Sequence, residues 1–204
     1  MSTGADAAEL IWPEPGGEPW VFAYGSLMWD PCFRYEEARP ARLHGWHRSL
    51  CILSVVNRGS RERPGLALGL DRGGSCAGFA FRLAAAEVAA ARERLWEREM
   101  LHAVYVPRIA RLRLQGGERA QALVFVAKPG HPQYTGDLRP EEAARLVAQG
   151  RGAYGSALDY LRNVVRHLDD FGIDDWPLRK VLRLAEAAAD MAPADLNQGR
   201  QSDE

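Results

Sequence analysis

Short apolar runs, each bounded by glycine, proline or polar residues, fill the first two thirds of the chain. Runs of this length that are rich in aliphatic and aromatic residues are typical of β-strands. The predicted strands cover 20–24, 50–56, 66–70, 76–83, 106–114 and 120–127. Four glycine-containing pairs, typical of turns, separate them: Arg58-Gly59, Pro64-Gly65, Gly73-Gly74 and Gly116-Gly117.

Helical spacing of apolar residues replaces this pattern at 84–100, at 140–149 and from Ser156 onward. Pro140 suits a first helical turn, and Gly150 suits the position just past a helix end. Ser156 and Asp159 form a capping signal, and a last helix is expected to begin near Asp175.

Closely spaced short strands with interleaved helices predict an α+β fold, with a mixed, barrel-like β-sheet and flanking helices. Regular β–α–β repeats are not indicated. The polar, Gly- and Pro-rich residues 1–17 are interpreted as a flexible leader. We expect a single domain over 18–192 and a polar tail over 193–204.

Composition and charge narrow the classes of function. Lys and Arg number 26 against 27 Asp and Glu, so no basic excess favours a nucleic-acid partner. No apolar run is long enough to cross a bilayer, and the N-terminus lacks the pattern of a secretory signal. The scattered cysteines, Cys32, Cys51 and Cys76, fit neither a disulfide framework nor a metal site. We expect a cytoplasmic protein that acts on a small molecule; the pattern specifies no oligomeric state.

Tyr24-Gly25-Ser26-Leu27 is the first candidate for a binding site, because it follows a buried-looking strand. Glycine allows a ligand to approach the backbone, and consecutive free amides can bind a carboxylate or an oxyanion. An ordinary turn is the competing interpretation. Ser26 is a poor nucleophile candidate, because a nucleophile elbow requires glycines where Tyr24 and Met28 stand.

Glu99 is the candidate acid–base residue. The expected core stripe of its helix runs through Val88, Ala91 and Leu95. At about 100° per residue, Glu99 lies roughly 20° from Val88 and therefore points inward. Burial, together with a position near the helix C-terminus, would raise the pKa of this carboxyl group toward neutrality.

The other glutamates of this helix serve as a comparison. Glu97 lies about 180° from Val88 and Glu93 about 140° away, so both are expected to face water. The competing interpretation of Glu99 is a structural ion pair with an arginine at the helix end, such as Arg108 or Arg111.

The remaining polar residues give weaker signals. The five histidines lack the spacing of metal ligands, so no metal and no cofactor are predicted. Cys51 and Cys76 are expected to be buried packing residues, with a cysteine hydrolase as the rival hypothesis. Arg92, Arg94 and Arg98 alternate with glutamates and are interpreted as a solvated helix face.

A series of short motifs resembles, in order and spacing, the ChaC-type γ-glutamylcyclotransferases over about residues 18–175. The series begins with Trp20-Val-Phe-Ala-Tyr-Gly-Ser-Leu-Met-Trp29 and Arg42-Leu-His-Gly-Trp-His-Arg-Ser49. It continues through Arg58-Gly59, Pro64-Gly-Leu-Ala-Leu-Gly-Leu70, Gly73-Gly-Ser-Cys-Ala-Gly78, Phe81-Arg82, Arg98-Glu-Met100 and Tyr105.

The resemblance implies an enzyme without a cofactor that cleaves glutathione to 5-oxoproline and Cys-Gly. It implies that Glu99 is the catalytic carboxylate and that the loop from Tyr24 to Leu27 holds the γ-glutamyl end. It also implies that Tyr105 and Tyr160 lie on the substrate side, the match around Tyr160 being looser.

Two departures from the family pattern bear on substrate preference. His102-Ala-Val104 replaces a glycine pair, and Asn57 stands where a histidine often precedes Arg-Gly. The alternatives are therefore cyclisation of other γ-glutamyl amino acids or amines, or a non-catalytic module that binds γ-glutamyl metabolites. Whether the loop amides bind the substrate carboxylate or the oxyanion stays open.

Overall fold

A computed structural model describes residues 18–191, in which five strands close into a barrel with the order β1-β3-β2-β4-β5. The strands are β1 (Trp20–Ala23), β2 (Glu37–Ser54), β3 (Gly65–Arg82), β4 (Tyr105–Leu114) and β5 (Arg119–Ala127). β1 runs parallel to β5, whereas the other neighbours are antiparallel. The predicted mixed, barrel-like sheet is thereby confirmed.

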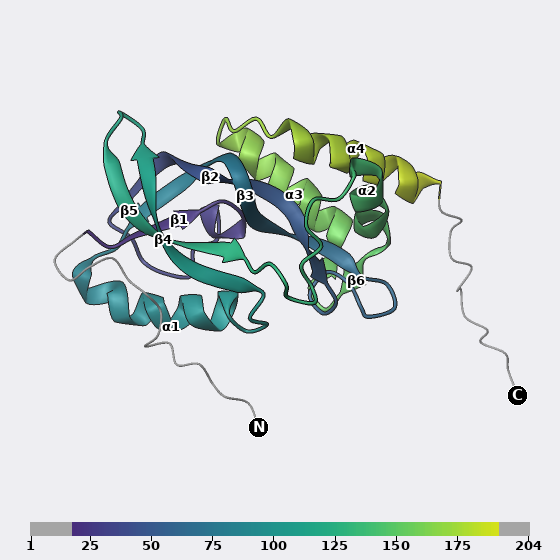
Figure 1. The fold of residues 1–204 in the computed structure, drawn as a ribbon, viewed down its shortest axis with the longest axis horizontal. Coiled ribbons are helices and arrows are strands. Elements are labelled where there is room, and N and C mark those ends of the chain that lie inside the picture. Colours follow the sequence, from purple (N-terminus) through teal and green to yellow (C-terminus); the bar gives the residue numbers. More distant parts are fainter. Residues whose placement is uncertain (1–17, 192–204) are drawn as a thin grey trace, which may run out of the picture.

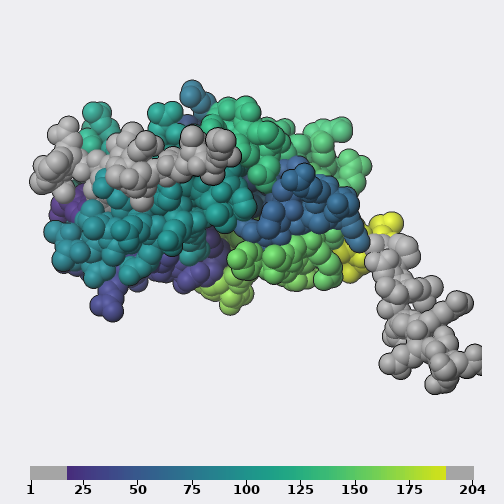
Figure 2. Space-filling view, turned by 90° about the horizontal axis from the view of Figure 1, so that it is seen from below, coloured from purple at the N-terminus to yellow at the C-terminus, as the bar shows by residue number. Residues whose placement is uncertain are grey.

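Helices pack on two sides of this barrel (Figure 1). The 3-10 helix η3 (Ala85–Glu87) leads into α1 (Val88–Glu99), which lies on one side. On the other side, α2 (Pro140–Gln149), α3 (Ala157–Asp170) and α4 (Trp176–Asp190) pack together. The short elements are η2 (Ser26–Met28), β6 (Arg151–Gly152) and β7 (Gly155–Ser156). Figure 2 shows the face with α1, where the segment joining β2 to β3 lies beside α3.

The helix ends follow the local signals in the sequence. The Ser156 hydroxyl accepts a hydrogen bond of 2.9 Å from the Asp159 amide and caps α3. Asp175 caps α4 by accepting from the Leu178 amide at 3.2 Å. Pro140 begins α2, and Gly150 follows its last residue.

The Gly73-Gly74 pair lies inside β3, so the prediction of a turn there was wrong. β3 is one strand of 18 residues that contains two of the predicted short strands, and β2 begins at Glu37, well before residue 50. The two strands pair along most of their length, with an irregularity in register between His44 and Trp46. Gly73 and Gly74 have φ values of 96° and 65°, which a bulged strand tolerates best at glycine.

The predicted leader (1–17) and tail (193–204) lie outside the described residues. Over the part of the chain that the structure describes, no helix is long and apolar enough to cross a membrane.

Candidate active site

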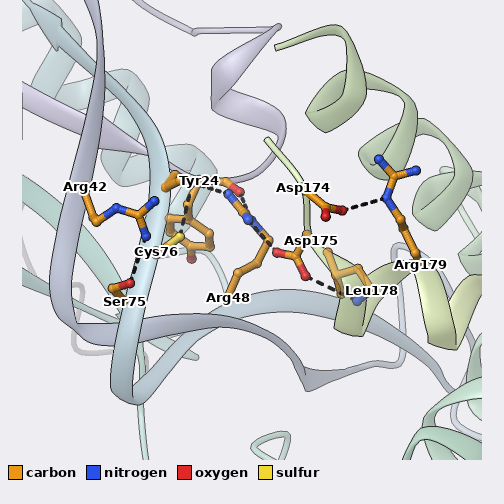
Figure 3. Close-up of polar contacts among 10 residues, drawn as sticks. Tyr24, Arg42, Arg48, Ser75, Cys76, Asp174, Asp175, Leu178 and Arg179 are labelled. Atoms are coloured by element: carbon orange, nitrogen blue, oxygen red, sulfur yellow. Dashed lines mark hydrogen bonds and ion pairs between the residues drawn. The ribbon is translucent and has the colours of Figure 1, made fainter. Parts of the chain in front are cut away.

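The loop after β1 is held in place by an arginine from β2. Arg48 is almost fully buried, and its Nε donates a hydrogen bond of 2.6 Å to the carbonyl oxygen of Tyr24. Its other nitrogens donate to Ala77 O at 2.6 Å and to Asp175 Oδ2 at 2.7 Å (Figure 3). The start of the candidate binding loop is therefore fixed by a buried, charged hydrogen-bond donor.

Three consecutive backbone amides follow this anchor. Within residues 18–191, the amides of Gly25, Ser26 and Leu27 donate no hydrogen bond to another group of the chain. All three residues line a cavity of about 50 Å³ that also contains Glu99. Consecutive free amides of this kind can bind a carboxylate or an oxyanion, which is the role that the sequence predicts for this loop.

Glu99 is the last residue of α1 and points inward, whereas Glu93 and Glu97 are exposed, as the helical period predicts. Only 15% of the Glu99 side chain is accessible to solvent. This burial raises the pKa of the carboxyl group from 4.5 to about 7, and the nearby Arg98 guanidinium lowers it in part. Such a group can both accept and return a proton near neutral pH.

The rival interpretation of Glu99, an ion pair with an arginine, holds for neither of the two arginines named from the sequence. Arg108 and Arg111 are exposed on β4, and neither forms an ion pair with Glu99. Glu99 instead forms an ion pair with its neighbour Arg98, whose Nε lies 3.7 Å from Glu99 Oε1. In the described chain the Glu99 carboxylate accepts no hydrogen bond.

Two tyrosines complete the cavity and are anchored on the same residue of β3. The Tyr105 hydroxyl donates to Leu68 O at 2.7 Å, and the Leu68 amide approaches the Tyr160 hydroxyl at 3.5 Å. Burial raises the pKa of the Tyr160 phenol to about 12 and that of Tyr105 well above its ordinary value, so both stay neutral. All seven residues predicted for the site line this cavity: Tyr24, Gly25, Ser26, Leu27, Glu99, Tyr105 and Tyr160.

A second cavity, of about 110 Å³, adjoins the first. Glu99 and Tyr105 line both, so the two cavities meet at these residues. Asn57 and His102, the two positions that depart from the family pattern, line only the second.

Arg98 was misread from the sequence as part of a solvated face. Its Nη2 donates to Ser26 Oγ at 3.0 Å, and its Nη1 donates to Asp30 O at 2.9 Å. Arg98 therefore connects α1 to the binding loop. Helical spacing gives no signal of this, because the partner is brought in by the barrel.

Arg48 was also missed, although the sequence contains a signal. Arg48 and Leu50 lie two residues apart in β2, and both are buried. A charged residue in phase with an apolar strand face is expected to have a buried partner.

The two cysteines proposed as nucleophiles of a cysteine hydrolase, Cys51 and Cys76, are both buried. Burial raises the pKa of the Cys51 thiol to about 12 and that of Cys76 to about 11. A thiol in that range is not a thiolate at neutral pH. No group of three or more metal-binding side chains lies together within residues 18–191.

Comparison with known proteins places this geometry in a family. The family model described as ChaC-like protein matches residues 19–188. The glutathione-specific γ-glutamylcyclotransferase of Escherichia coli (strain K12) is 36% identical over 176 residues, covering 86% of this chain and 76% of that protein. The human glutathione-specific γ-glutamylcyclotransferase 1 is 31% identical over 156 residues, covering 73% and 70%.

The fold has a counterpart among solved structures. A crystal structure of a γ-glutamylcyclotransferase specific to glutathione from yeast superposes with a TM-score of 0.75 at 20% identity, covering 82% of this chain and 95% of that one. The barrel and its helices therefore have the γ-glutamylcyclotransferase fold. This chain belongs to the ChaC-like family.

Proposed function

We propose that this protein is a γ-glutamylcyclotransferase that cleaves glutathione to 5-oxoproline and Cys-Gly, with Glu99 as the general acid and base. One observation carries the proposal: Glu99, a buried carboxyl group with a pKa of about 7, lines a cavity together with three residues whose backbone amides are free. The E. coli and human relatives are named for this activity, which supports the same reaction here.

The reaction requires positioning and proton transfer. The α-amine of the γ-glutamyl group attacks its own γ-carbonyl carbon, which forms the C–N bond of a five-membered lactam. The bond from that carbon to the cysteine nitrogen then breaks. Holding the chain folded supplies the proximity advantage, because the attack is intramolecular.

Glu99 handles the proton in both directions. Its carboxylate takes a proton from the attacking amine and returns it to the departing nitrogen, so no net proton is consumed. A pKa of about 7 suits both halves of this task, since the carboxyl group is ionised in a large fraction of molecules at neutral pH.

The other site residues bind and orient the substrate. The amides of Gly25, Ser26 and Leu27 would bind an oxygen anion of the γ-glutamyl group, either its α-carboxylate or the developing oxyanion. Tyr105 and Tyr160, whose hydroxyl groups are anchored on Leu68, line the same cavity as the loop.

The second cavity favours one alternative, a different leaving group. In this proposal the leaving group would occupy the second cavity, which Asn57 and His102 line. Since these two residues depart from the family pattern, the same cyclisation could act here on other γ-glutamyl amino acids or amines.

The experiment is incubation of the purified protein with glutathione and with several γ-glutamyl dipeptides, followed by mass spectrometry for 5-oxoproline. Glu99→Gln is the matched control. We expect 5-oxoproline from glutathione in the wild type and almost none in the variant. Formation of 5-oxoproline only from the dipeptides would select the alternative, and binding without turnover of any of them would indicate a non-catalytic module.

A further inference from the structure

A cavity of about 890 Å³ lies away from Glu99. It separates the paired strands β2 and β3 from the segment 137–140 and from the start of α4. No residue that lines it lines either cavity at Glu99. Its volume is within the range of roughly 300–1,000 Å³ that is typical of small-molecule sites.

The charged side chains of this cavity leave a surplus of cations. Asp175 pairs with the buried Arg48 at 2.7 Å, and Asp174 pairs with Arg179, which does not line the cavity. Asp137 is the remaining carboxylate of the lining.

The lining contains three further cationic side chains besides this one carboxylate: Arg42, Arg139 and Lys180. Among the residues described, none of the three has a carboxylate partner. Arg42 donates to Ser75 Oγ at 3.0 Å, and the Lys180 ammonium lies 5.8 Å from the centroid of the Trp176 ring. A negatively charged group in the cavity would therefore meet cations that no carboxylate among residues 18–191 pairs with.

The wall also contains apolar side chains, and an ion pair holds its two sides in a fixed relation. Leu50, Ile173 and Val181 contribute aliphatic surface. Arg48 spans the wall from β2 to Asp175, which also caps α4 (Figure 3). Because a buried ion pair fixes the two sides relative to each other, the cavity is preformed and a ligand need not order it.

We infer that this cavity is a second ligand site, which binds an organic anion with an apolar body, its acidic group facing Arg42 and Lys180. The inference does not depend on the reaction at Glu99.

The test is titration of the full chain with 2-naphthoate, followed by amide chemical shifts in NMR, with neutral 2-naphthamide as the matched probe. We expect saturable shifts of amides in 137–140 and 172–181, and binding of the neutral probe at least about tenfold weaker, as expected for loss of charged hydrogen bonds. Equal affinity for the two probes, or shifts confined to other residues, would overturn the inference.

Two kinds of variant sharpen the test. The double variant Arg42→Gln/Lys180→Gln should weaken 2-naphthoate binding by about tenfold or more. Arg166→Gln, an exposed arginine on α3 outside the cavity, should leave it unchanged. Glu99→Gln should also bind 2-naphthoate normally. Loss of binding in Glu99→Gln, or full binding in the double variant, would contradict a separate anion site.

Discussion

The Arg98 guanidinium donates a hydrogen bond of 3.0 Å to the Ser26 hydroxyl, although the two residues lie 72 positions apart. The same guanidinium also bonds to Asp30 O at 2.9 Å and approaches Glu99 at 3.7 Å. One side chain thus touches both the binding loop and the candidate acid–base residue. The Ser26 hydroxyl therefore has a structural role, since it accepts the hydrogen bond that ties Arg98 to the loop.

We predict that Ser26→Ala keeps most of the activity and that Arg98→Ala loses more. Ser26→Ala removes one hydrogen bond, whereas Asp30 still holds Arg98, so a loss of less than about tenfold is expected. Arg98→Ala also removes the cation that lowers the Glu99 pKa, so the acidic limb of the pH–rate profile should move to higher pH. Rates of 5-oxoproline release against pH measure both effects. Complete inactivity of Ser26→Ala would show a direct role for its hydroxyl.

We predict that Glu99→Gln folds and binds substrate but is almost inactive. Glutamine preserves size and hydrogen-bonding reach but cannot take up and return a proton. General acid–base contributions are about 10²–10⁴-fold, and one residue acting in both directions should lie near the upper end. Turnover should be measured beside the melting temperature. The exposed Glu93→Gln and Glu97→Gln are the controls, and each should change rate and stability little. Near wild-type turnover by a normally melting Glu99→Gln protein would disprove the assignment.

We predict that Glu99 makes the stability of the wild type depend on pH. The folded pKa of about 7 exceeds the unfolded value of 4.5, so stability contributed by the protonated carboxyl is fully present below about pH 4.5 and is lost as pH rises through 7. The full loss corresponds to about 3 kcal/mol. Glu99→Gln lacks this loss, so the variant should gain stability relative to the wild type between about pH 5 and about pH 8.

Chemical denaturation of both proteins across that pH range measures this difference. A constant difference in the free energy of unfolding would mean that the carboxyl group of Glu99 has an ordinary pKa.

We predict that Gly25→Val loses activity by filling the cavity and leaves the fold intact. Gly25 has a φ of −137°, and a Cβ atom there would meet only Leu68 Cδ1, at 3.6 Å, an ordinary contact. The branched methyl groups would enter the small space that the substrate needs, and misplacement of substrate by about 1 Å can cost roughly 100-fold in rate. Gly25→Ala is the milder control. A Gly25→Val protein that melts normally and keeps full turnover would place the substrate elsewhere.

We predict that activity survives exhaustive dialysis against a chelator, because ring closure needs only positioning and proton transfer. Rates of 5-oxoproline release before and after dialysis provide the measurement. Loss of turnover that one added metal restores would contradict the mechanism.

The sequence by itself determined the features that depend on near neighbours. Helical spacing pointed Glu99 inward and its neighbours Glu93 and Glu97 outward, and the structure has them so. The Ser156 cap and the start of α2 at Pro140 also followed from local chemistry. These properties could be predicted because the energy that decides each one arises within a few residues along the chain.

Only the tertiary structure decided the features that depend on distant pairing. Gly73-Gly74 predicts a turn locally, but pairing with β2 carries β3 through it as one strand. Arg98 looks solvated on its own helix until the barrel brings Ser26 to it, and Arg48 meets Asp175 across 127 positions. Such contacts form only where the chain closes on itself, since the partner of each charge is set by how helices and loops pack on the barrel rather than by the residues beside it.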